Sequence, residues 1–141
     1  MRKRTKAREY ALTILYQSEM TRKEVERQAE QFWSEEESKD DDVMQFCQRL
    51  ISGVEINKEA INEKIAKYAT NWQMKRMAVI DRNILRLGVF ELVFALDIPP
   101  KVTINEAVEL AKKYGDLESS KFVNGILDKI HKTELNTPKE S

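Results

Sequence analysis

The longest run of apolar residues lies between Ile80 and Leu96 and predicts a helix. At about 100° per residue, its apolar positions cover nearly the whole circumference, and a helix that is apolar on all sides is a buried one. Charged residues interrupt the run, which is also too short to cross a membrane. We therefore predict a central core helix over these residues, with other helices packed against it.

Charged positions within this stretch carry separate expectations. Arg82 and Arg86 are one helical turn apart and mark the strip that we expect to reach solvent or a partner. Glu91 falls among apolar positions, so it needs a hydrogen-bonding partner if it is buried.

Further segments repeat apolar residues at helical spacing, and none has the alternation of a strand. The additional predicted helices cover residues 5–19, 22–33, 42–54, 58–69, 104–114 and 117–131. Thr21 with Glu24, and Thr103 with Glu106, form capping-box patterns at two predicted helix starts. Trp72 lies in the connector before the central helix, and we expect it to pack on the core and join two halves.

The composition favours helices. Four glycines and three prolines in 141 residues argue against a β fold with many turns. Cys47 is the only cysteine and cannot form an internal disulfide, which fits a reducing cytoplasm. With one cysteine and one histidine, His131, a closed zinc site within one chain is not expected.

These observations predict the domain organisation. A chain of this length forms one domain with a substantial core. We expect an all-α fold over 1–135, built of two packed helical halves at about 1–70 and 71–135. A polar tail follows at 136–141.

Charge is distributed unevenly, although the net charge is zero. The first eight residues carry cations and no acid, at Arg2, Lys3, Arg4, Lys6 and Arg8. Residues 19–42 carry ten acids against four bases. Cations in the first turn of a helix oppose its dipole, at up to about 1 kcal/mol each. A solvated, frayed end is one interpretation of the basic start; we favour a phosphate-binding patch.

No catalytic pattern is present in the sequence. It has no Gly-rich phosphate loop after a strand, no Gly-x-Ser-x-Gly elbow and no His-Glu-x-x-His motif. The acidic run at 34–42 lacks the Gly-centred spacing of a calcium loop and is interpreted as a solvated turn. The sequence therefore predicts a binding protein without a cofactor rather than an enzyme.

Several stretches carry the motifs of one known family. They are VIDRNILRLGVFELVF at 79–94, DIP at 97–99, VTINEAVELAK at 102–112 and KFVNGILDKI at 121–130. Together with Ala7–Glu9 and Leu15–Gln17 in the opening helix, they resemble the NusB family of bacterial transcription antitermination factors. The resemblance covers nearly the whole chain and is most specific from residue 72 to 130. It implies an all-helical fold of two packed halves.

The resemblance implies a function in transcription. The protein would bind the boxA element of nascent RNA, as in ribosomal RNA operons, together with NusE, which is also a small-subunit ribosomal protein. The pair would join the RNA polymerase elongation complex with other Nus factors and suppress termination, in the cytoplasm and without a membrane partner. Joint binding would compensate for the modest, salt-sensitive affinity expected of one small basic segment.

The resemblance also implies site residues. The family's basic N-terminus, which would contact RNA phosphates, corresponds here to Arg2, Lys3, Arg4, Lys6 and Arg8. Tyr16, Lys121 and Phe122 match positions on the same RNA-facing side, although Tyr16 and Phe122 also fit core aromatics at helical spacing. Asp81 and Glu118 are the candidates for contact with NusE.

Two alternatives remain open from the sequence. A similar helical domain precedes the catalytic part of some ribosomal RNA cytosine methyltransferases, so the chain could be a stand-alone RNA-guide module. Nothing after residue 131 has the length to bind S-adenosylmethionine, which argues against the enzyme itself. The chain could also be a structural helical protein that forms a homodimer, through the strip with Arg82 and Arg86 or the face around Trp33.

Overall fold

The computed structural model describes residues 2–69 and 76–135, and regular structure within these ranges is helical. The elements in chain order are α1 Lys3–Thr21, α2 Val25–Glu35, α3 Asp41–Ile56, α4 Lys58–Tyr68, α5 Val79–Phe94, α6 Pro100–Tyr114, α7 Leu117–Ile130 and a π-helical turn, η2, at His131–Leu135. The predicted all-α fold is confirmed. No helix in the described ranges is long and apolar enough to cross a membrane.

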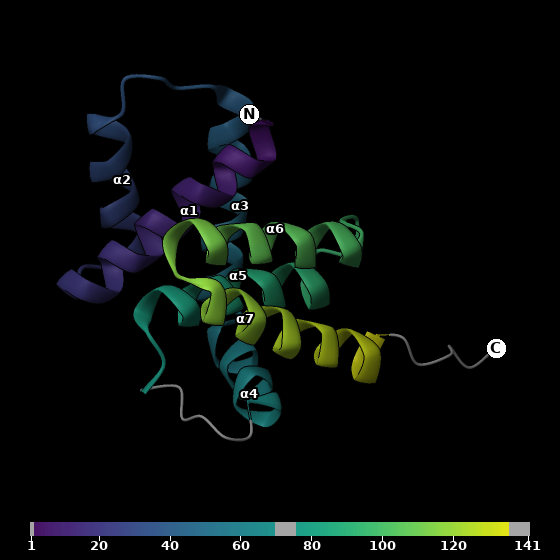
Figure 1. Ribbon diagram of the computed structural model, residues 1–141. Coiled ribbons are helices and arrows are strands. Elements are labelled where there is room, and N and C mark those ends of the chain that lie inside the picture. The colour runs from purple at the N-terminus through teal and green to yellow at the C-terminus, as the bar shows by residue number, and fades with distance from the viewer. Residues whose placement is uncertain (1, 70–75, 136–141) are drawn as a thin grey trace.

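Helix α5 lies at the centre of the molecule, with α6 and α7 across one side and α4 below it in this view (Figure 1). Every residue from Asn83 to Leu92 is buried. The helix packs against α1, α3, α4, α6 and α7. The predicted buried central helix is therefore confirmed, with bounds of Val79–Phe94. Apolar side chains on all sides of α5 allow its neighbours to bury surface against it from several directions.

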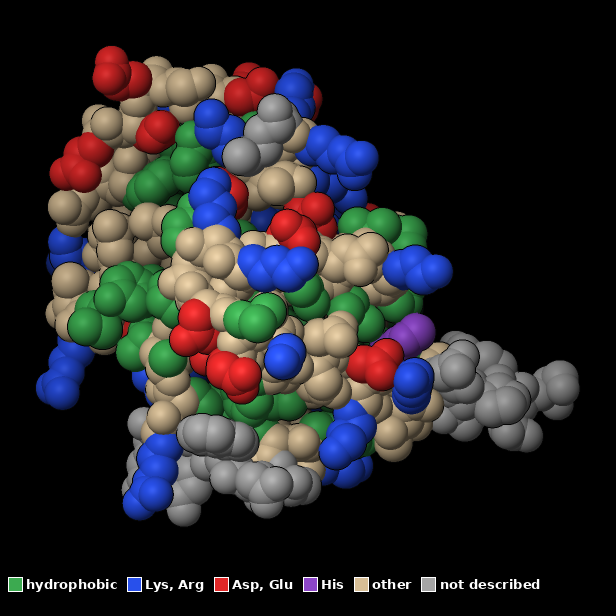
Figure 2. All heavy atoms as spheres, viewed as in Figure 1, with side chains coloured by type: hydrophobic (Ala, Val, Ile, Leu, Met, Phe, Trp, Pro, Cys, Tyr) green, Lys and Arg blue, Asp and Glu red, His purple; other side chains and the backbone are tan. Residues whose placement is uncertain are grey.

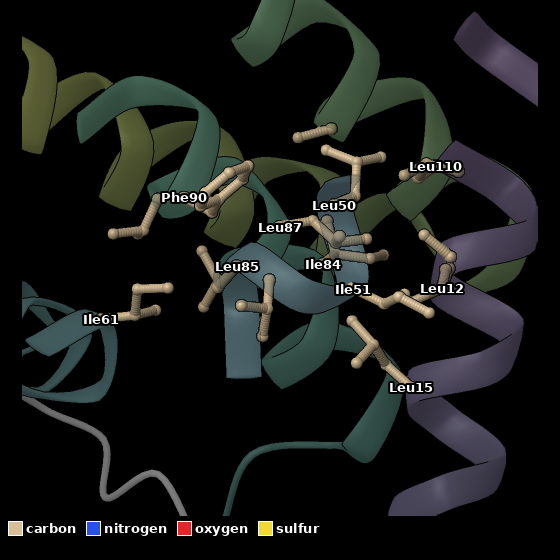
Figure 3. Packing of buried hydrophobic residues seen from close by; sticks show 14 of the residues in the cluster. Leu12, Leu15, Leu50, Ile51, Ile61, Ile84, Leu85, Leu87, Phe90 and Leu110 are labelled. Carbon is tan, nitrogen blue, oxygen red and sulfur yellow. The ribbon is translucent and has the colours of Figure 1, made fainter. Parts of the chain in front are cut away.

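The hydrophobic core forms around α5, where side chains from several helices point toward one another (Figure 3). Leu and Ile side chains buried in this way contribute about 1.5–3 kcal/mol each relative to exposure. The residues labelled in the figure come from α1 (Leu12, Leu15), α3 (Leu50, Ile51), α4 (Ile61), α5 (Ile84, Leu85, Leu87, Phe90) and α6 (Leu110).

Aspartate side chains cap two of the helices. Asp40 accepts hydrogen bonds from the backbone N–H groups of Asp42 and Val43, at 2.9 and 3.2 Å, where α3 begins. Asp116 accepts one from the N–H of Ser119 at 2.8 Å, where α7 begins. Each cap satisfies amide groups that have no partner within the helix.

Both predicted capping boxes are wrong. Thr21 is the last residue of α1, and its hydroxyl donates to the carbonyl of Gln17 at 2.8 Å, while α2 begins only at Val25. Helix α6 begins at Pro100, which suits a first helical position because its fixed φ is already helical and its missing N–H would have no partner there. Thr103 is therefore inside the helix, and its hydroxyl is used in a contact with α5 described below.

Some expectations fall outside the described residues. Trp72, the boundary between two halves near residue 70, and the polar tail at 136–141 lie there. The division of the domain into two halves therefore stays a prediction.

Candidate nucleic-acid interface

Basic side chains gather at the N-terminal end of α1, where Figure 2 shows them interspersed with acidic ones. We call the exposed or half-buried cations of this end the basic arm: Arg2, Lys3, Arg4 and Lys6. Lys3 Nζ lies 2.9 Å from Asp42 Oδ2 and 3.3 Å from Asp40 Oδ2. Hydrogen bonds to Asp42 and Asp40 raise the pKa of Lys3 above its ordinary value.

Aromatic rings hold two members of the basic arm against the protein. The Arg4 guanidinium lies 4.4 Å from the centroid of the Phe46 ring on α3. The Lys6 ammonium lies 5.6 Å from the centroid of the Tyr10 ring, one turn further along α1. Cation–π contacts of this kind orient a cation without neutralising its charge. The arm therefore presents its charge from an ordered helix.

Arg8, which the sequence groups with these cations, is buried and does not belong to the basic arm. Its side chain is 5% exposed, and its Nε and Nη2 donate to the two carboxylate oxygens of Glu91 at 2.8 and 2.9 Å. Its Nη1 lies 3.4 Å from Glu106 Oε1, and Thr103 donates to Glu91 Oε1 at 2.8 Å. The predicted need of Glu91 for a partner is confirmed. These contacts join α1, α5 and α6 and leave Arg8 no surface for a phosphate.

The strip of Arg82 and Arg86 also differs from expectation, because both guanidinium groups are bound inside the molecule. Arg86 is 8% exposed and bonds through Nη1 to Glu19 at 3.0 Å and through Nε to Asn62 at 3.0 Å. Arg82 bonds to the other oxygen of Glu19. Burial lowers the pKa of Arg86, and the charge of Glu19 opposes that shift. The pair joins α5 to the end of α1 and does not form an exposed strip.

A cleft of about 550 Å³ lies where α5 and α7 begin, and we call it the α5–α7 cleft. Four predicted site residues line it: Asp81, Glu118, Lys121 and Phe122. Met77, Asp116 and Ser119 complete much of its wall. The structure thus brings together two residues expected to contact RNA and two expected to contact NusE.

The charged form of Asp81 is destabilised by its surroundings in this cleft. Burial raises the pKa of its carboxyl group, the charge of Asp116 raises it further, and a hydrogen bond from Ser119 opposes the shift. Within the described part of the chain, its buried Oδ1 has no hydrogen-bond partner. A buried carboxylate oxygen left without a partner in this way destabilises the charged form of Asp81.

Tyr16 lies toward the cleft end of α1 rather than at the basic arm. Glu19, nearly one turn beyond Tyr16, is bound to Arg82, the neighbour of the cleft residue Asp81. Between Arg4 and Glu19 the helix rises by about 22 Å, at about 1.5 Å per residue. Tyr16 therefore lies about three turns along α1 from the basic arm, and its place on one RNA-facing side with Lys121 and Phe122 stays a prediction.

The single cysteine and histidine stand apart from both surfaces. Cys47 has no exposed surface, and burial raises the pKa of its thiol to about 12, so it is a core residue rather than a reactive thiol. His131 is half-buried at the end of α7. Over residues 2–69 and 76–135, no group of three or more His, Cys, Asp or Glu side chains could hold a metal ion.

Sequence reasoning missed the contribution of α3 to the basic end of the molecule. Arg49 lies on α3, and its guanidinium is 6.0 Å from the same Phe46 ring that contacts Arg4. It donates to both carboxylate oxygens of Asp97, at 3.1 and 2.5 Å. Its position outside the apolar face of the predicted helix was a signal, but nothing in the sequence places it beside α1.

Comparison with known proteins gives consistent results. The NusB family model matches residues 5–132. The Transcription antitermination protein NusB of Myxococcus xanthus (strain DK1622) is 46% identical over 138 residues, covering 96% of this chain and 98% of that protein.

Solved structures agree in fold as well as sequence. T. maritima NusB is 40% identical, with a TM-score of 0.85 over 92% of this chain and 91% of that one. A structure of antitermination factors NusB and NusE in complex with dsRNA contains a chain that is 32% identical, with a TM-score of 0.86 over 94% of this chain and 98% of its own. By its sequence and its fold, this chain belongs to the NusB family.

Proposed function

We propose that this protein is a transcription antitermination factor that binds boxA RNA of nascent ribosomal RNA transcripts together with NusE. The observation that carries the proposal is the basic arm, an exposed cationic cluster on a helix of a chain with zero net charge. The family relatives named as antitermination proteins, and the related NusB–NusE structure with dsRNA, support it. The pair would act within the RNA polymerase elongation complex with other Nus factors.

Within this proposal, the basic arm contacts the RNA backbone. Arg2, Lys3, Arg4 and Lys6 carry the positive charge that phosphates require, and their contacts are independent of base sequence. Lys121 and Phe122 provide a second RNA contact at the edge of the α5–α7 cleft, since an exposed lysine and a half-buried aromatic ring suit a phosphate and an unstacked base.

The acidic side of the α5–α7 cleft is proposed to bind NusE. Asp81 and Glu118 line it, and Asp116 adds a third carboxylate. Asp81 is half-buried, and together these carboxylates give this side of the cleft a negative charge that suits a basic group of NusE. Tyr16 lies toward the same end of α1 and is assigned to RNA as predicted.

The proposed role is binding and does not include catalysis. The side chains of the basic arm and the cleft offer charge, a ring and hydrogen-bond donors, which hold RNA and a protein partner in place. We place the protein in the bacterial cytoplasm, because nascent ribosomal RNA is made there. The methyltransferase-related guide module is not favoured, since the M. xanthus NusB relative is matched over 98% of its own length.

The experiment that tests the proposal compares two RNAs of equal length and composition. The protein and NusE, purified and mixed, are titrated into a boxA-containing single strand and into a scrambled one. We expect tighter binding to boxA RNA, and weaker binding to either RNA when NusE is omitted. Equal affinity of the pair for the two RNAs would refute the proposal.

A further inference from the structure

A groove of about 490 Å³ separates the start of α1 from α3 and belongs to the basic end of the molecule. Lys3 and Arg4 of the basic arm line one side, and Gln45, Phe46 and Arg49 of α3 line the other; Asp42 stands at its edge. We call it the α1–α3 groove. Residues 45 apart in sequence therefore face one another across a single concave surface.

Phe46 forms the floor of this groove and gathers cations on its ring. The guanidinium carbons of Arg4, Arg8 and Arg49 lie 4.4, 5.3 and 6.0 Å from its centroid. Phe46 is only 7% exposed, so no base can stack on it. Its ring acts instead as a platform that brings guanidinium groups close together despite their mutual repulsion.

The charges around the platform are not equally neutralised. Arg8 is bound by Glu91 and Glu106 inside the protein. Arg49 is bound by Asp97, whose pKa this contact lowers to about 2, and Asp97 is exposed. No carboxylate of the described residues lies within ion-pairing distance of Arg4. The groove therefore contains one guanidinium, that of Arg4, without an ion pair to a described carboxylate, and a second held by an exposed acid on which the charge of Arg4 also acts.

We propose that the α1–α3 groove binds a phosphodiester of single-stranded RNA between the guanidinium groups of Arg4 and Arg49. The inference rests on the proposed RNA-binding function and extends its site from α1 to α3. Guanidinium groups match phosphate oxygens with paired N–H donors. Phosphate can replace Asp97 at Arg49, because it offers the same paired oxygen acceptors as the carboxylate. Lys3 can move from Asp42 to the same anion, because a single exposed ion pair of this kind contributes little to stability.

The test uses Arg49→Gln, with Arg27→Gln as a control that removes one exposed cation from α2. Each protein is mixed with NusE and titrated with boxA and scrambled single-stranded RNA at two salt concentrations. We expect Arg49→Gln to lower the affinity for both RNAs about tenfold, which is the effect of losing one charge-assisted hydrogen bond. The slope of log affinity against log salt should fall by about 0.7, the value for one phosphate of a single strand. Arg27→Gln should change affinity by less than about twofold.

A gain-of-function variant keeps the test independent of any folding defect. Asp97→Asn releases Arg49 and should tighten RNA binding, whereas Asp128→Asn removes a half-buried acid from α7, paired there with Lys132, and should not. The proposed phosphate site would be refuted if Arg49→Gln and Arg27→Gln had equal affinity for RNA, or if Asp97→Asn and Asp128→Asn did. That result is distinct from a wild-type pair without preference for boxA, which would refute the proposed function instead.

Discussion

The Arg8 guanidinium, bound to Glu91 within the core, predicts a large effect of a single substitution. Glu91→Gln removes one charge of a buried pair and leaves the other desolvated, which typically costs about 3 kcal/mol of unfolding free energy. Urea unfolding monitored by circular dichroism measures this loss.

Glu109→Gln is the matched control for that substitution. Glu109 is exposed and pairs with Lys112 one turn away, so its loss should change the unfolding free energy by less than about 0.5 kcal/mol. If the Glu91 variant were as stable as the Glu109 variant, Arg8 would not be anchored in solution as described. Arg8 would then return to the set of RNA contacts.

The strained carboxylate of Asp81 predicts a substitution that stabilises the protein. Burial and the charge of Asp116 raise its pKa in the folded state, so the folded protein holds its proton more tightly than the unfolded chain does. The charged form then destabilises the fold at neutral pH. Asp81→Asn should raise the melting temperature at pH 7 and weaken binding to NusE.

The pH dependence of that gain follows from the direction of the shift. The gain should shrink as pH falls through the raised pKa of Asp81, and vanish below the ordinary value for an aspartate, about 3.9. Melting curves of wild type and variant across this range measure the gain, with Asp128→Asn as a control on an aspartate that is paired with Lys132. A gain that persisted unchanged at the lowest pH would contradict the electrostatic origin.

At this scale the sequence distinguishes residue type but not partner. It shows that Glu91 needs a donor, and it places Arg8 among five nearby cations. It cannot show which cation is the donor, because the two residues are 83 positions apart. The same limit applies to Arg86, whose partner Glu19 is 67 positions away.

Among the elements, the crossing of α3 and α5 depends on a glycine. A Cβ added at Gly53 would overlap the ring of Phe90, a rigid group that is itself buried. Gly53→Ala should therefore destabilise the protein by about 1–3 kcal/mol, as overpacking does. Thermal or urea unfolding gives the value.

At Gly125 on α7, substitution by alanine is expected to stabilise the protein instead. A Cβ at this exposed position meets no atom within 4 Å, so Gly125→Ala should stabilise the protein by up to about 1 kcal/mol through helix propensity alone. Opposite signs for the two variants are predicted. Stabilisation by both would show that α3 and α5 are further apart than described.

Helices were predictable from the sequence because their apolar spacing is local, and α5 stands out since it is apolar on every side. Their starts were less predictable. The hydroxyls of Thr21 and Thr103 suit a cap, but one bonds to the preceding turn of α1 and the other to Glu91. A side chain that fits a cap can satisfy a different partner, and only the tertiary structure determines which.

For the whole molecule, the net charge is zero, but different surfaces lie near the two ends of α1. The basic arm and the α1–α3 groove lie at its beginning, and the α5–α7 cleft lies toward its end. The family resemblance points to residues in both regions, but not to Arg49 in the groove or Asp116 in the cleft. It does not place the two regions relative to each other, because their positions arise from the packing of the helices.

The central claim is that arginines near the start of α1 divide into those that contact RNA and one that builds the core. Arginine Nε–Hε signals in an NMR spectrum test it directly, in a titration of the protein and NusE with boxA RNA. We predict that the signals of Arg4 and Arg49 shift while those of Arg8, held by Glu91, and the distant Arg27 stay unchanged. A shift of Arg8 with Arg4 and Arg49 unmoved would contradict the account.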